Sequence, residues 1–310
     1  MKATESQPVR VQQATKRSNT RWLEYLKDFS FAVPALVILT LFIYYPLLNS
    51  LYLSFTNWNM TKPVKKFIGF DNYVYLLTSD MFYKVLKITF TYTILDVSIT
   101  LGLGLLLALL FNSVSKFFGF MRAIIFMPHY ISMVIVSMIF LWIFNGRYGL
   151  VNELLSWVGL EPIQWLTNTK TALWVLVLIG VWKGVGFTMI IFIAGLRSIP
   201  VEYYEASGID GATKWTQFWK ITLPLLSPTT LFLVVTHFIS SMQVFQSVDV
   251  LTNGGPLDST KAMVYWIYEM AFSEFRTGRA SALVIMFFLI IVLLTMVQMY
   301  VSKKKVHYEG

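Results

Sequence analysis

The chain has 310 residues, of which 56% are hydrophobic and only 13% charged, well below the share of about 25% charged residues that is usual in a soluble domain. Together with a mean hydropathy of +0.62, this composition excludes a compact soluble monomer and predicts an all-α, polytopic membrane protein. The net charge of +9 comes from basic residues that flank apolar runs, so we expect no nucleic-acid partner, and the absence of cysteine excludes disulfides and thiolate metal sites.

Six apolar runs are long enough to cross a hydrocarbon core about 30 Å thick, for which a helix needs about 20 residues. In chain order the runs are residues 31–55, 88–111, 123–144, 172–196, 225–248 and 280–301. We therefore expect residues 29–302 to form one membrane domain with six spans. Residues 1–28 are expected to be a polar cytoplasmic tail that ends in an interfacial helix, or else in the flank of the first span, and residues 303–310 a second cytoplasmic tail.

The charges of the loops indicate which side of the membrane holds the termini. Lys and Arg number 14 on the side of the two termini and 10 on the opposite side, where they are spread over longer loops. Cytoplasmic loops carry the excess of basic residues in membrane proteins, so both termini are predicted to be cytoplasmic.

The segment between the fourth and fifth spans, residues 197–224, is long for an inner loop. Its residues predict a helix, a turn at Gly211, and a second helix from Ala212 towards Ile221, with Pro224 at the start of the fifth span. Its composition alone is that of a solvated connector, or of a surface that another protein approaches closely.

Three groups of residues in this segment follow one another at a particular spacing. They are Glu205-Ala206-Ser207, Asp210-Gly211-Ala212 and Ile221-x-Leu223-Pro224. The pattern closely resembles the signature loop of permease subunits in binding-protein-dependent ABC importers.

Further motifs resemble the carbohydrate-uptake branch of that family, and they run through nearly the whole chain. They include Phe67-x-Gly69-x-x-Asn72-Tyr73, Asp80-x-Phe82 and Leu251-Thr252-Asn253-Gly254-Gly255-Pro256. The chain is most similar in type to the first of the two sugar permeases, the maltose-permease-F or lactose-permease-F type.

The resemblance implies the fold of a type I ABC importer transmembrane domain in the bacterial cytoplasmic membrane. It also implies a heterodimer with a second permease, two cytoplasmic ATPase subunits, an extracytoplasmic solute-binding protein and a sugar as cargo. In that family the first helix of the signature loop docks in a cleft of the ATPase. The motif residues of the loop would therefore couple this chain to the ATPase, with Glu205 as the charged anchor and Ser207 in place of the usual Ala.

The chain lacks the motifs of a nucleotide or metal site. No Gly-x-x-x-x-Gly-Lys-Ser/Thr sequence occurs, so ATP is expected to be bound by the partner subunits, and this chain is expected to hold no cofactor. No His-Glu-x-x-His sequence occurs either, and the chain is not expected to be an enzyme.

Polar residues inside the spans form the candidate substrate pathway, which consists of Asp96, Lys183, Ser241, Gln243 and Gln246. Lys183 either lines a cavity, where it donates to sugar hydroxyls or pairs with an acidic sugar, or it pairs with Asp96 or with the partner permease. Gln243 and Gln246 lie three residues apart in the fifth span, so they are expected to share a helical face, and they would bind sugar hydroxyls or hold helices together.

Two other functions remain open at this point. A secondary transporter would need an ion or proton site in the membrane and would work without an ATPase. An integral-membrane enzyme acting on lipid-linked sugars would need carboxylates or histidines clustered at one membrane face, and the sequence offers no convincing cluster.

Overall fold

The structure, a computed structural model, describes residues 17–61 and 64–303, so parts of the two predicted tails, residues 1–16 and 304–310, lie outside the described residues. The helices are α1 (Arg17–Leu39), η1 (Thr40–Tyr44), α2 (Tyr45–Ser54), α3 (Asp71–Thr78), α4 (Asp80–Phe111), α5 (Lys116–Phe126), η2 (Met127–Tyr130), α6 (Met133–Ile143), α7 (Leu150–Trp157), α8 (Ala172–Ser198), α9 (Val201–Ile209), α10 (Lys214–Gln217), η3 (Phe218–Thr222), α11 (Leu223–Leu225), α12 (Ser227–Met242), α13 (Gln246–Leu251), α14 (Met263–Tyr268), η4 (Glu269–Ser273) and α15 (Thr277–Lys303). Within the described ranges the only β-pairing is an isolated bridge between Thr56 and Phe67, which confirms the all-α prediction.

The chain divides into two compact units, one ending at Tyr52 and one beginning at Leu53. In the first unit, helical backbone begins at Arg17 and passes through α1, η1 and α2 without a break, although η1 is a π-helical turn. The segment expected to form an interfacial helix is thus continuous with the first span, which agrees with the alternative that it is the flank of that span.

Four described helices are long and apolar enough to cross a membrane, and the number rises to six if two bent helix pairs each count as one span. The four are 29–54, α4, α8 and most of α15. The six predicted crossings correspond to these four helices and the two bent pairs, which fall at the third and fifth positions.

The third span is broken where a proline interrupts the ladder of backbone hydrogen bonds. Pro128 lies in the 3₁₀ helix η2, the backbone at Ile131 is extended, and α6 leaves at 98° to the preceding helix. Because proline has no N–H, it frees carbonyl groups that another side chain must satisfy.

The fifth span departs from the prediction at both ends. A bend of 60° follows α11, which contains Pro224, so this proline does not begin the long helix. The helix α12 begins at Ser227 and ends at Met242 instead of Val248, and α13 is a separate helix after a break in the chain.

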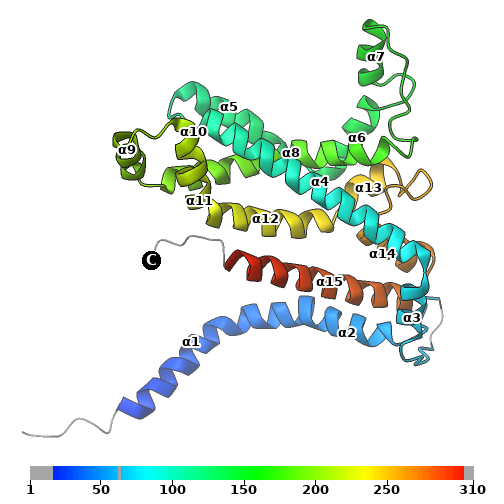
Figure 1. Ribbon diagram of the computed structural model, residues 1–310. Coiled ribbons are helices and arrows are strands. Elements are labelled where there is room, and N and C mark those ends of the chain that lie inside the picture. Colours follow the sequence, from blue (N-terminus) through cyan, green and yellow to red (C-terminus); the bar gives the residue numbers. More distant parts are fainter. Residues whose placement is uncertain (1–16, 62–63, 304–310) are drawn as a thin grey trace, which may run out of the picture. The chain divides into compact units, whose positions relative to one another are not determined.

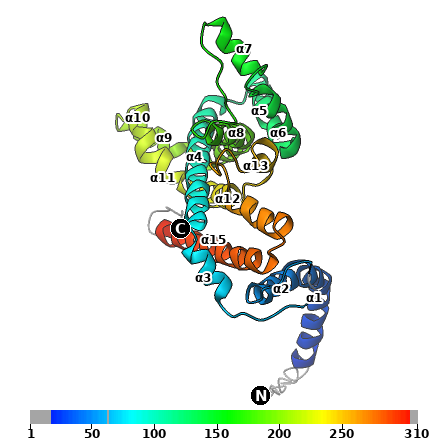
Figure 2. The ribbon, with the colours of Figure 1, turned by 90° about the vertical axis from the view of Figure 1, so that its right-hand side faces the viewer.

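The second unit is organised around α4, α8 and α12, which pack against one another (Figure 1). Gly180 and Gly184 of α8 form a Gly-x-x-x-Gly pair, and a Cβ on Gly184 would lie 2.9 Å from the His237 ring of α12. Small residues of this kind let helix backbones approach closely within a membrane. Figure 1 shows α9 and α10 at one end of these helices and α13 and α14 at the other, and Figure 2 shows α9, α10 and α11 grouped together.

Candidate functional site

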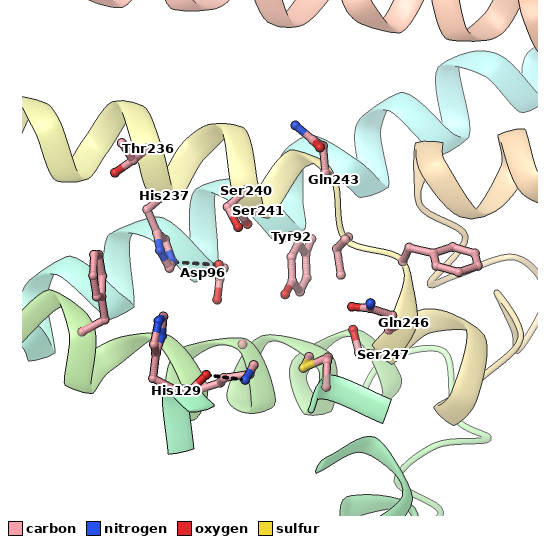
Figure 3. Close-up of a pocket in the computed structure, with 17 residues that line it drawn as sticks. Tyr92, Asp96, His129, Thr236, His237, Ser240, Ser241, Gln243, Gln246 and Ser247 are labelled. Atoms are coloured by element: carbon pink, nitrogen blue, oxygen red, sulfur yellow. Dashed lines mark hydrogen bonds and ion pairs between the residues drawn. The ribbon is translucent and has the colours of Figure 1, made fainter. Parts of the chain in front are cut away.

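A cavity of about 420 Å³ lies between α4, α8 and α12, and is closed by the segment that joins α12 to α13 (Figure 3). Its lining residues are Tyr92, Asp96, His129, Met133, Gly180, Lys183, Gly184, Phe187, Thr236, His237, Ser240, Ser241, Gln243, Val244, Phe245, Gln246 and Ser247. The structure therefore brings all five residues of the predicted substrate pathway to one cavity, although they come from four helices, α4, α8, α12 and α13, and from the break between the last two.

Gln243 and Gln246 reach the cavity in a different way from the predicted one. Gln243 lies just after the last residue of α12, the backbone at Phe245 is not helical, and Gln246 begins α13. The prediction that the two amides share one helical face is wrong, because the helix on which it rested ends before them. Both residues still line the cavity, although Figure 3 shows the Gln243 amide pointing away from Asp96.

Asp96 is the buried acidic group of the cavity. Its Oδ2 lies 3.1 Å from Nε2 of His237, and its side chain is 4% exposed. Its other oxygen, Oδ1, has no hydrogen-bond partner among the described residues, and neither have the buried hydroxyls of Ser241 and Ser247. An unpaired polar group in the interior is costly, and because each of these three oxygens is almost wholly covered by its neighbours, a ligand hydroxyl would reach it only after those neighbours move.

Lys183 forms hydrogen bonds to backbone carbonyls that the sequence did not predict. Its ammonium group donates to the backbone carbonyls of Pro128, His129 and Ile131, at 3.3 Å and 2.9 Å for the first two. These carbonyls lie at the break of the third span, where the helical backbone ends, so Lys183 supplies donors that the helix does not provide there. The predicted pairing of Lys183 with Asp96 is wrong, because Asp96 pairs with His237.

We expect the Lys183→Met substitution to lower stability without changing which saccharide is carried. Three carbonyls would lose a charged donor, and each such hydrogen bond contributes about 1.5–3 kcal/mol. The midpoint of thermal unfolding in detergent should fall by about 5 °C or more, whereas Lys170→Met, at an exposed loop lysine, should leave it unchanged. A stable Lys183→Met protein that loses uptake of acidic saccharides alone would contradict this expectation.

Several lining residues were missed by sequence reasoning. Tyr92 is buried one turn before Asp96 on α4, so its helical spacing from the aspartate was an available signal. His129 is stacked between the rings of Phe126 and Phe187, with centroids 5.5 Å and 5.0 Å away. Phe187 is distant from His129 in the sequence, so only the fold brings these two rings together. Ser247 lies inside the predicted fifth span, 225–248, but in the structure it belongs to the separate helix α13.

The predicted coupling loop is a helix, a turn and a second helical run. Gly211 has a φ of +79°, a backbone conformation that favours glycine, and it ends the connection from α9. The second run begins at Lys214 instead of Ala212, because the Thr213 hydroxyl caps it by accepting a hydrogen bond from Thr216 N at 3.3 Å.

The motif residues of this loop differ in exposure. Glu205, Ala206, Asp210 and Gly211 are exposed, as residues that meet another protein would be. Ser207, Ala212, Ile221, Leu223 and Pro224 are half-buried, and the last three lie in η3 and α11, which lead into α12. Ile209 was not predicted to matter, yet its side chain is 88% exposed at the end of α9, where an apolar group would gain from burial against a partner.

At the opposite end of the unit, the loop between α13 and α14 is held by charged groups. Lys261 lies 2.8 Å from both Asp258 Oδ1 and Glu269 Oε2, and Lys84 of α4 also reaches Asp258. The hydrogen bond from Lys261 holds the pKa of the Asp258 carboxyl below its ordinary value. Burial of Lys261 acts to lower the pKa of its ammonium group, but the hydrogen bonds to Asp258 and Glu269 outweigh burial and raise that pKa. The loop that carries the Thr252-Asn253-Gly254-Gly255-Pro256 motif is therefore anchored to the bundle.

Comparison with known proteins gives concordant results. Residues 100–307 match the family described as "Binding-protein-dependent transport system inner membrane component". The chain is 36% identical over 303 residues to the probable ABC transporter permease protein YesP of Bacillus subtilis (strain 168), covering 96% of this chain and 97% of YesP. It is 33% identical over 302 residues to the sulfoquinovosyl glycerol transport system permease protein SmoG of Agrobacterium fabrum (strain C58 / ATCC 33970), covering 96% and 98%.

A solved structure shares the fold. It is the bacterial alginate ABC transporter in complex with an alginate pentasaccharide-bound periplasmic protein, one chain of which matches with a TM-score of 0.79 and 26% identity over 94% of this chain and 98% of that chain. The likeness confirms that the helical unit has the fold of an ABC importer transmembrane domain. The chain belongs to the family of binding-protein-dependent transport system inner membrane components, which are multi-pass permeases of ABC transporters and not enzymes.

Proposed function

We propose that this chain is one of the two permeases of an ATP-driven importer, and that it moves a saccharide across the bacterial cytoplasmic membrane. The observation that carries the proposal is the cavity, a space of about 420 Å³ inside a membrane protein that is lined by polar residues of several helices. The substrates in the names of two similar proteins, sulfoquinovosyl glycerol and alginate, support a saccharide as the cargo.

The cavity suits a polyhydroxylated molecule on chemical grounds. Asp96 Oδ1 accepts hydrogen bonds only, while Ser241, Ser247 and the amides of Gln243 and Gln246 both donate and accept. Sugar hydroxyls can serve all of these groups. Because Lys183 donates its protons to backbone carbonyls, it gives no reason to prefer an acidic saccharide.

The loop 197–224 supports the proposed assembly with ATPase subunits. Its exposed residues Glu205, Ala206 and Ile209 would meet an ATPase, which would bind the ATP that this chain has no motif to hold. A heterodimeric second permease and an extracytoplasmic solute-binding protein complete the assembly, and the family description already requires a binding protein.

In the proposed topology the membrane domain spans residues 29–302 and both termini face the cytoplasm. Tails 1–28 and 303–310 then lie on the same side as the ATPase, which is also the side of loop 197–224. The ATPase subunits would drive alternating access by moving packed helices between two discrete arrangements.

Reconstitution in proteoliposomes tests this function. The complete transporter, supplied with a solute-binding protein and its radiolabelled saccharide, should accumulate the saccharide only when ATP is present on the ATPase side. Calorimetry of the binding protein would identify the saccharide to use.

The alternatives give different results in the same vesicles. Uptake that continues without the ATPase subunits and follows an ion gradient would make the chain part of a secondary transporter. Chemical modification of a lipid-linked sugar without ATP would make it an enzyme. Either result would overturn the proposal.

A further inference from the structure

The helix α9 is held to the rest of the unit by polar contacts instead of by apolar burial. None of its residues is buried, and the turn that follows it contains Gly211 in a left-handed conformation. A helix with no buried side chain and a glycine turn has little to fix its orientation, so the side-chain hydrogen bonds that reach it have a large influence on its position.

Gln217 of α10 makes two of these hydrogen bonds. Its Nε2 group donates to the carbonyl oxygen of Tyr204, at 3.1 Å, and to the Ser207 hydroxyl, at 2.9 Å. Ser207 in turn donates to the Tyr204 carbonyl at 3.0 Å, and the Tyr204 hydroxyl lies 3.0 Å from the Thr222 hydroxyl of η3. We call this set of contacts the Gln217 bridge.

The helix that carries Gln217 is connected along the chain to a helix that lines the cavity. The helices α10, η3 and α11 follow one another directly and enter α12 through the 60° bend. Four residues of α12 line the cavity, and among them His237 pairs with Asp96 of α4. A displacement of α9 that is passed through the bridge would therefore act on the helix that carries one side of the proposed substrate site.

We propose that Gln217 is a positioning residue that transmits the movement of α9 to α12, and this proposal rests on the proposed function. The side chain is suited to the task because it spans two helices and donates two hydrogen bonds from one amide nitrogen. Asparagine is one methylene shorter and could not keep both bonds in place, and alanine would keep neither. Without the bridge, α9 could still bind an ATPase, but its movement would be taken up at the Gly211 turn instead of in α12.

The test measures saccharide uptake and substrate-stimulated ATP hydrolysis in the same proteoliposomes that hold the complete transporter. With Gln217→Ala, the number of saccharides taken up per ATP hydrolysed should fall at least about fivefold, as expected when hydrogen bonds of about 1 kcal/mol each are lost from the coupled state. ATP hydrolysis itself should continue, because the residues proposed to meet the ATPase are unchanged.

Thr216→Ala is the matched control. Its hydroxyl lies 3.0 Å from that of Thr213 within the same short helix and does not reach α9, so the uptake per ATP should stay at the wild-type value. If Gln217→Ala leaves the ratio unchanged, or if Thr216→Ala lowers it equally, the proposal is wrong.

A second pair of variants decides the matter if Gln217→Ala does not assemble. Ser207→Ala removes one acceptor of the bridge and should lower the ratio, while Ser207→Thr retains the hydroxyl and should restore it. An unchanged ratio in Ser207→Ala would also overturn the proposal. Uptake by the wild-type transporter without ATP would instead refute the proposed function, so the two failures can be told apart.

Discussion

Uptake by the complete transporter should fall below about 3% of the wild-type rate when Glu205 is replaced by alanine. Glu205 is exposed in α9, at the centre of the proposed contact with the ATPase. Removing one partner of a charged pair that is buried in an interface costs about 2–5 kcal/mol, which is at least thirtyfold in the binding equilibrium. The stimulation of ATP hydrolysis by the loaded binding protein should disappear with it.

Glu202→Ala controls for the loss of a carboxylate from the same helix. Glu202 is also exposed, but it lies in the first turn of α9 and outside the Glu205-Ala206-Ser207 motif. This variant should keep most of the uptake. Normal uptake by the Glu205→Ala transporter, with the protein present in the membrane in the usual amount, would count against the assigned docking surface.

The second large effect is expected from Gly180→Leu. A Cβ atom on Gly180 would lie 2.5 Å from Asp96 Oδ1 and 2.7 Å from the Tyr92 hydroxyl, closer than packed atoms come. A leucine must therefore displace both side chains and fill part of the cavity, and overpacking of this kind costs about 1–3 kcal/mol. We expect uptake to fall at least tenfold, with loss of the substrate-dependent part of ATP hydrolysis.

Gly102→Leu is the control for Gly180→Leu. Gly102 lies on α4, in the same set of packed helices, but a Cβ at this position would meet no atom within 4 Å. Uptake should remain near the wild-type rate. If both leucine variants transport equally well, the cavity does not lie on the path of the saccharide.

The crossings of the membrane could be predicted because their signal is local. A run of about 20 apolar residues is recognisable wherever it occurs, and α8, predicted as 172–196, extends only two residues further. The bends were not predictable to the same degree. A break such as the one at Pro128 is tolerated in a membrane span when a neighbour satisfies the backbone carbonyls left without helical donors, and here the neighbour is Lys183, 55 residues away in the chain.

The residues that line the cavity were easier to predict than the pairs that these residues form. A polar residue in a span avoids lipid, so Asp96 and Lys183 were both expected to face the interior of the bundle, and both do. Their partners depend on how far each helix is rotated about its axis and on where the helices break. Neither property is encoded in a short stretch of sequence, which is why Asp96 was not predicted to pair with His237.

The division of the cavity wall among separate helices has a mechanical consequence. Asp96 belongs to α4 and its ion-pair partner His237 to α12, so the two sides of the recognition surface stay together only while these helices keep their present separation. A rigid shift of α12 that opened a route to one face of the membrane would also separate these two residues, which line the proposed saccharide site. Opening of that route and release of the saccharide would then be a single conformational change, and neither would need a separate step.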